Sequence, residues 1–118
     1  MEPDLSLSTQ ALAERAVVSV GGEVDVATAK SLTDHALVAL RDVSPHIVVD
    51  LGDVTFMDST GLKSLITISQ RASLAGGSFA VVGPTSSVRK LLKLTGLEEA
   101  FPVYDTLAEV TGREAPTP

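Results

Sequence analysis

The sequence contains no cysteine and no tryptophan, and only three phenylalanines and one tyrosine among its 118 residues. Without cysteine the chain can form neither disulfides nor thiolate metal sites, and it has no cysteine nucleophile. So few aromatic side chains leave no platform on which bases could stack, which argues against the RNA-binding sheet modules. The hydrophobic residues, 44% of the chain, are mainly aliphatic, so the core must be built from them.

Basic residues are also scarce, with nine against 15 acidic ones and a net charge of −6. A protein that holds nucleic acid by neutralising phosphates needs the opposite balance, so nucleic acid is not expected as a partner. No run approaches the roughly 18 uninterrupted apolar residues of a membrane span, and the first residues lack the features of a secretory signal. We therefore expect a cytoplasmic protein with no direct insertion into a membrane.

The charges are unevenly distributed along the chain. Residues 1–58 carry a net charge of −7, residues 59–97 carry five bases and no acid, and residues 98–118 carry a net charge of −4. Such asymmetry often marks an interaction surface, although segments that are separate in sequence can equally mix in space.

Length and apolar patterning predict a single α/β domain over residues 1–118, with an ordered core over about 5–111 and a frayed tail over 112–118. Segments 5–9 and 16–20 predict an opening antiparallel hairpin, which we expect to end at glycines 21 and 22.

The later strands are expected to be parallel, because they alternate with helices. Segment 46–51 is β-branched and almost continuously apolar, which predicts a central strand. We expect a turn at Gly52-Asp53 and a short apolar return over 54–57. Segment 79–82 predicts another buried strand and segment 101–104 an edge strand.

Helical spacing of apolar residues predicts helices that end near Arg41, Ala75 and Thr95, and a last helical turn over 106–111. The residues expected to face the core from these helices are Ala29, Leu32, Ala36, Ala39, Leu40, Leu62, Leu65, Ile66, Ser69, Ala72, Val88, Leu91, Leu92 and Thr95.

No constellation of catalytic or metal-binding residues is visible. His35 and His46 belong to no metal pattern, and neither is placed as a general base. Ser59 lacks the preceding glycine of the G-x-S-x-G elbow of serine hydrolases. The sequence therefore predicts no catalytic residue, no metal site and no enzymatic activity.

The most informative segment is Asp58-Ser59-Thr60-Gly61, which opens the second predicted helix. Its simplest interpretation is an N-cap, because Asp and Ser side chains accept hydrogen bonds from the first amides of a helix. A second interpretation is a phosphorylation site, where an added phosphate would meet free amides and the positive end of the helix dipole. Lys63, one turn later, would tolerate the added charge.

Residues 48–62, which include this segment, closely resemble the signature of STAS domains, specifically the bacterial anti-sigma factor antagonists. Residues 22–25, 75–77, 88–97 and 101–105 resemble the remaining blocks of that family in the same order. The Asp-Ser-Thr-Gly element between strand and helix is the specific part of the resemblance.

The resemblance implies the STAS fold, a four- to five-stranded mixed β-sheet with about four α-helices packed largely on one side. It also implies a protein with no cofactor and no enzymatic activity. Ser59 corresponds to the phosphorylated residue of the family, and Thr60 is a minor alternative. The implied partner-binding residues are Asp25, Asp58, Ser59, Thr60, Gly61 and Lys63.

The resemblance further implies partner switching. In the family, the unphosphorylated antagonist binds an anti-sigma factor that is also a serine kinase, and the sigma factor is released. Phosphorylation ends this binding, and a PP2C-type phosphatase restores it. The alternative is an accessory subunit of a transporter or lipid-trafficking complex, in which the serine is only a cap. The complete Asp-Ser-Thr-Gly element favours the first function.

Overall fold

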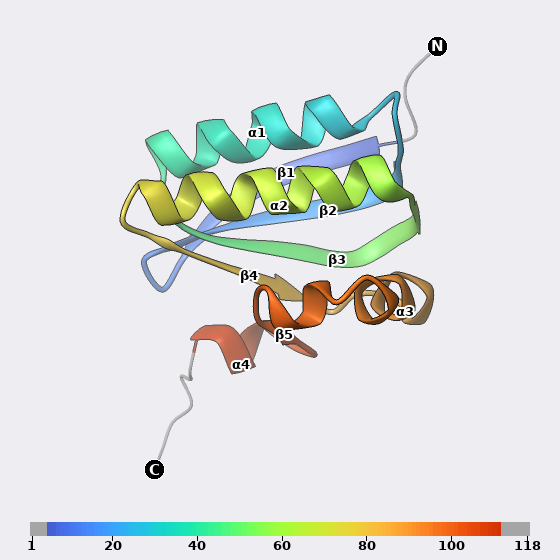
Figure 1. Cartoon of the computed structure of the whole chain (residues 1–118). Coiled ribbons are helices and arrows are strands. Elements are labelled where there is room, and N and C mark those ends of the chain that lie inside the picture. The colour runs from blue at the N-terminus through green and yellow to red at the C-terminus, as the bar shows by residue number, and fades with distance from the viewer. Residues whose placement is uncertain (1–4, 112–118) are drawn as a thin grey trace.

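A five-stranded sheet in the order β1-β2-β3-β4-β5 runs through the computed structural model, which describes residues 5–111 (Figure 1). The strands are β1 (Leu5–Leu12), β2 (Arg15–Val24), β3 (His46–Met57), β4 (Ser78–Val82) and β5 (Val103–Tyr104). β1 and β2 pair antiparallel, and all later neighbours are parallel. The predicted mixed sheet is confirmed, and the predicted frayed tail, 112–118, lies outside the described residues.

The helices cover the two faces of the sheet unequally. They are α1 (Ala29–Asp42), α2 (Ser59–Leu74), α3 (Ser86–Leu94) and α4 (Leu107–Thr111), with one 3₁₀ turn at Leu97–Glu99. α1 and α2 lie side by side over the sheet (Figure 1), and apolar residues of α1, α2 and α3 join one large core cluster. The other face holds a small cluster under α4, built on Val17, Val48 and Val82. The arrangement predicted for the helices is therefore confirmed.

Two predicted turns are wrong, because β2 and β3 continue through them. Glycines 21 and 22 lie inside β2, and Gly52-Asp53 lies inside β3, which is one strand of 12 residues rather than two short ones. The pairing of β2 with β3 shifts register on both sides of Gly21 and Gly22, before Gly21 and after Gly22. Such bulges absorb extra residues without ending a strand. Both strands consequently reach the same edge of the sheet.

The buried faces of α2 and α3 differ in part from those predicted. Ile66 and Ser69 are only half-buried, whereas Ser64 and Ile68 are buried, and on α3 Thr95 is exposed and Leu91 half-buried. Ser64 is accommodated in the interior because its hydroxyl donates to the backbone oxygen of Ala29 at 3.1 Å, which satisfies a buried polar group.

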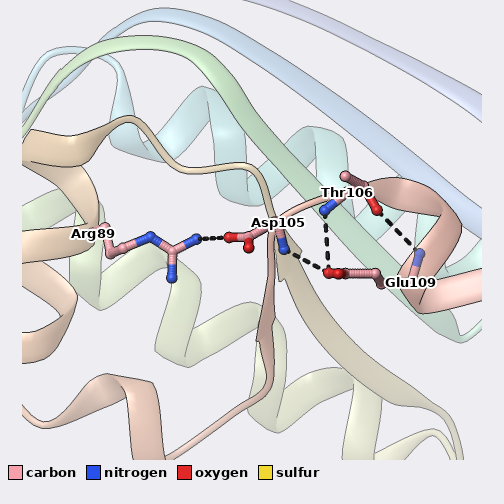
Figure 2. Close-up of polar contacts among 4 residues, drawn as sticks. All are labelled: Arg89, Asp105, Thr106 and Glu109. Atoms are coloured by element: carbon pink, nitrogen blue, oxygen red, sulfur yellow. Dashed lines mark hydrogen bonds and ion pairs between the residues drawn. The ribbon is translucent and has the colours of Figure 1, made fainter.

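The last strand and helix are held by polar contacts drawn in Figure 2. Thr106 and Glu109 form a capping box at α4: the Glu109 amide donates to the Thr106 hydroxyl at 3.3 Å, and the Thr106 amide donates to Glu109 Oε1 at 3.4 Å. Arg89 of α3 donates to Asp105 at 2.6 Å. This pair joins the acid-free segment to the acidic C-terminal segment, so the charge blocks partly mix in space.

No helix within the described residues is long and apolar enough to span a bilayer.

Leu32 provides a test of the core. Its side chain, on α1, is fully buried against the sheet. Leu32→Ala should lower the free energy of unfolding by about 2–5 kcal/mol, because the core loses the buried apolar atoms and keeps a cavity in their place. The matched control is Leu74→Ala on α2, where the side chain is 83% exposed and the change should stay within about 0.5 kcal/mol. Urea denaturation measures both, and equal losses would contradict this description of the core.

Candidate functional site

The ends of β2 and β3 lie next to each other and bring two of the predicted site segments together. Val24 pairs with Met57, and the Asp58 amide donates to the Val24 backbone oxygen at 3.2 Å. The chain that leaves β2 at Asp25 therefore starts beside the chain that leaves β3 at Asp58. Both segments lie at the end of the sheet where α1 and α2 begin (Figure 1).

Gly61 allows α2 to begin this close to β2. A Cβ atom at this position would lie 2.6 Å from Met57 Cγ, 2.9 Å from Val24 Cγ1 and 3.1 Å from the Val24 oxygen. Contacts under 3.0 Å require an atom to move, and here the neighbours belong to a packed core. The glycine of the Asp-Ser-Thr-Gly element is thus required by packing, whatever its part in binding.

Asp58 caps α2, as the first interpretation of this segment predicts. Its Oδ1 atom accepts hydrogen bonds from the amides of Thr60 at 2.9 Å and Gly61 at 3.3 Å, and from the Thr60 hydroxyl at 2.5 Å. The Thr60 hydroxyl, and to a smaller extent the amides, hold the pKa of Asp58 below its usual range, because these bonds favour the charged carboxylate.

This cap corrects one expectation. A phosphate on Ser59 was expected to meet free amides at the start of α2, but the amides of Thr60 and Gly61 are already bound to Asp58. The phosphate would instead stand beside a carboxylate. The helix start therefore offers the added charge less compensation than its dipole alone suggests.

The two candidate hydroxyls, those of Ser59 and Thr60, differ in exposure and in hydrogen bonding. Ser59, the first residue of α2, is exposed, and no hydrogen bond of its hydroxyl is found within residues 5–111. Thr60 is half-buried, and its hydroxyl is bound to Asp58. An incoming phosphoryl donor would reach the Ser59 oxygen directly, whereas Thr60 would first have to give up a short hydrogen bond.

Asp25 is held in a tight turn between β2 and α1. Its Oδ1 atom accepts from the Ala27 amide at 2.9 Å, and its own amide donates to the Thr28 hydroxyl at 3.0 Å. That buried hydroxyl donates in turn to the Glu23 backbone oxygen at 2.7 Å. Asp25 therefore lies in the turn that precedes α1, three residues before Thr28, the N-cap of that helix.

Lys63 is exposed one turn after Ser59 on α2 and forms no ion pair within the described residues. The six predicted site residues, Asp25, Asp58, Ser59, Thr60, Gly61 and Lys63, thus lie at one end of the molecule. The two histidines do not join them: His35 bonds to the Thr9 hydroxyl and His46, at the opposite end of β3, to that of Ser78. No metal-binding group of His, Asp or Glu occurs in residues 5–111.

Sequence reasoning missed two residues at this end. Val26 follows Asp25 in the turn, and Phe56 lies two residues before Asp58; their side chains are 81% and 49% exposed. An apolar residue directly after Asp25, one of the predicted site residues, was a usable signal for Val26. The signal for Phe56 was hidden, because it lies in a run whose other apolar residues, Val54 and Met57, are buried.

Comparison with known proteins identifies the family. The STAS domain model matches residues 7–110. The chain belongs to the STAS family. It is 36% identical to the anti-sigma-F factor antagonist RsfB of Mycobacterium tuberculosis over 92 residues, which cover 78% of this chain and 75% of RsfB.

Solved structures agree with this assignment. An anti-sigma factor antagonist from Mycobacterium paratuberculosis superimposes with a TM-score of 0.81 and 32% identity, covering 97% of this chain and 98% of the other. The phosphorylated form of SpoIIAA from Bacillus has the same fold, with a TM-score of 0.70, 19% identity and coverage of 93% of this chain and all of the other.

The pKa of Asp58 leads to a pH-dependent prediction. A carboxylate whose pKa is lowered by folding stabilises the native state above its unfolded pKa of about 3.9, and this contribution is lost as the pH falls through the folded value. Asp58→Asn keeps an N-cap without a charge. The stability of wild type relative to Asp58→Asn, measured by urea denaturation from pH 7 to pH 3, should therefore decrease with falling pH. A constant difference would contradict the assigned role of the carboxylate.

A second prediction concerns Gly61. In a free helix, glycine to alanine is stabilising by about 1 kcal/mol. Here we expect Gly61→Ala to lower the free energy of unfolding by about 1–3 kcal/mol, because the new methyl group overpacks the contact with Val24 and Met57. Urea denaturation shows whether Gly61→Ala raises or lowers the free energy of unfolding. A gain in stability would show that the contact of Gly61 with Val24 and Met57 has room for a methyl group.

Proposed function

We propose that this protein is a phosphorylation-controlled anti-sigma factor antagonist. Its unphosphorylated form binds an anti-sigma factor that has serine kinase activity, which frees the sigma factor. Phosphorylation of Ser59 by that kinase ends the binding, and a PP2C-type phosphatase restores it. The proposed partner-binding surface consists of Asp25, Asp58, Ser59, Thr60 and Lys63, while the buried Gly61 supports it by letting α2 begin against β2.

The observation that carries the proposal is the difference between two adjacent hydroxyls. Asp58 engages the Thr60 hydroxyl and the amides of Thr60 and Gly61, while Ser59 stays exposed on the first turn of α2. A kinase thus meets one accessible acceptor on a rigid helix start. Modification of Ser59 breaks no hydrogen bond of the cap, so the domain can remain folded with the phosphate attached.

The same cap explains why the phosphate would act as a switch. A phosphoserine carries about −1.5 to −2 charges at pH 7, and here it would stand next to the Asp58 carboxylate with the nearest amides already taken. If a partner closes over this position, the charge loses its water, which costs several kcal/mol. A loss of about 2.8 kcal/mol is a hundredfold in affinity, enough for on and off states.

Lys63 would reduce the effect of a phosphate on Ser59 on the stability of the folded domain, rather than its effect on partner binding. It lies four residues after Ser59 on the exposed side of α2, at a spacing where opposite charges stabilise a helix by a few tenths of a kcal/mol. The phosphate would therefore cost the folded domain little.

The comparisons support this proposal from outside the chain. The named relatives are anti-sigma factor antagonists, and one protein of the same fold, SpoIIAA, has been solved in a phosphorylated form. The fold can thus carry a phosphate without being lost.

The test uses wild type, Ser59→Ala and Ser59→Glu with the serine-kinase anti-sigma factors of the same cell and radiolabelled ATP. We expect wild type to bind and take label, Ser59→Ala to bind without label, and Ser59→Glu to bind at least about tenfold more weakly, because the carboxylate adds charge at the contact.

Ser86 provides the matched control, since it is also an exposed serine on the first turn of a helix. Ser86→Ala and Ser86→Glu should behave as wild type in both assays. Undiminished labelling of Ser59→Ala would place the phosphate elsewhere. Wild type that binds none of these anti-sigma factors would exclude the proposed function and leave the accessory-subunit alternative.

A further inference from the structure

Two exposed hydrophobic side chains lie at the same end of the molecule as Ser59. Val26 is 81% exposed and Phe56 is 49% exposed, and both are absent from the two core clusters. Single exposed hydrophobics need no explanation on a protein surface. These two attract notice because Val26 directly follows Asp25 and Phe56 lies two residues before Asp58, in the two segments that the pairing of β2 with β3 holds side by side.

The backbone fixes where the two side chains lie. Phe56 pairs with Glu23 of β2 in the last register step before Met57 pairs with Val24. Val54 and Met57 point into the main core, so the exposed Phe56 side chain between them lies outside it. Val26 lies two residues beyond Val24. Because successive Cα atoms are about 3.8 Å apart, the Cα atoms of Phe56 and Ser59, three residues apart, lie within about 11 Å of each other.

Two carboxylates at this end, those of Asp25 and Asp58, are engaged within the molecule. Asp58 Oδ1 accepts three hydrogen bonds from the start of α2, and Asp25 Oδ1 accepts two from its own turn, from the Ala27 amide and the Thr28 hydroxyl. These groups shape the surface rather than leaving it as unpaired charge. The exposed side chains at this end without a hydrogen bond or ion pair within the described residues are those of Glu23, Ser59 and Lys63, and beside them lie the apolar groups of Val26 and Phe56.

We propose that Val26 and Phe56 are apolar anchors for an apolar, weakly charged surface of the partner, which covers Ser59 when it binds. This inference rests on the proposed function and adds to it which residues of the chain supply the binding contact. Binding energy is commonly concentrated in a few side chains near the centre of an interface, often aromatic ones, so Phe56 is the stronger anchor of the two.

An apolar contact also accounts for the direction of the switch. A partner surface rich in lysine and arginine would hold a phosphate more tightly, since charge-assisted hydrogen bonds would form. An apolar surface supplies no such partner, so a phosphate on Ser59 that this surface covers would be desolvated without compensation. The proposed release on phosphorylation thus favours an apolar partner surface over a basic one.

The experiment measures the affinity of the full chain for the anti-sigma factor that wild type binds, by isothermal titration calorimetry. The variants are Phe56→Ser and Val26→Ser. The chain offers controls of nearly equal exposure away from the site: Val38→Ser, where Val38 is 47% exposed, and Leu74→Ser, where Leu74 is 83% exposed. Thermal melting confirms that each variant is folded, and Phe56→Leu keeps an apolar side chain at the anchor position.

We expect Phe56→Ser to weaken binding about tenfold or more and Val26→Ser by a smaller factor, while both controls stay within about twofold of wild type. Phe56→Leu should bind within about threefold of wild type. Raising the salt from 50 to 200 mM should change the wild-type affinity by less than about threefold, because apolar contacts are not screened.

The outcomes separate this inference from the proposed function. If wild type binds and Ser59→Glu is released, but Phe56→Ser and Val26→Ser match the controls, the anchors are wrong and the switch stands. A steep loss of affinity with salt would overturn the apolar partner surface. If the anchor variants lose binding while Ser59→Glu binds like wild type, the anchors stand and the switch is wrong. No binding by wild type would overturn both.

Discussion

The parallel pairing of β2 with β3 up to their last residues is the constraint on which the site depends. The bond from the Asp58 amide to the Val24 oxygen closes this pairing, and Gly61 lets α2 begin against it without a clash. Two segments that are 33 residues apart in sequence are thereby fixed beside each other on a rigid frame. Loops that carry function are commonly positioned in this way by a buried scaffold.

Asp58 shows that the two interpretations of the Asp-Ser-Thr-Gly element are complementary rather than competing. As a cap it takes up two amides and the neighbouring threonine hydroxyl. Because it does so, Ser59 has no structural task at the helix start and its hydroxyl stays free. An N-cap serine would be bound to an amide and poorly available to a kinase. Placing the cap one residue earlier makes the serine modifiable without loss of the helix.

Much of the fold followed from local patterns, and the exceptions among the strands have one cause. Helix ends were predicted correctly near Ala75 and near Thr95, which Gly96 follows in the left-handed conformation that glycine adopts readily. The turns expected at Gly21-Gly22 and Gly52-Asp53 are bulged strand instead, because pairing between β2 and β3 outweighs the local preference of glycine for turns. Such pairing joins distant segments and leaves no signal in either one alone.

The site could be predicted in its residues but not in its electrostatics. Asp58, Ser59 and Gly61 are adjacent in sequence, and a single motif marks them. Asp58 already binds the amides of Thr60 and Gly61 and so offsets the positive end of the α2 dipole. This depends on which atoms form the hydrogen bonds, and the residue types alone do not specify that. Which residues of β3 are buried likewise depends on its bulges, since strict alternation from Leu51 would place Val54 on the other face of the sheet, whereas it lies in the main core.

The uneven charge distribution acquires a more limited meaning in the folded protein. Arg89 pairs with Asp105, so part of the acid-free segment is balanced by the acidic C-terminal segment, on a surface pair that contributes at most about 1 kcal/mol. At the start of α2 the distribution matters in a different way. The absence of acids after Asp58 leaves Lys63 as the nearest unpaired charge of the described residues on α2, while the carboxylates of Asp25 and Asp58 are held in a turn and a cap. A phosphate on Ser59 would therefore be the strongest free charge at this end, and any partner that excludes water there would respond to it.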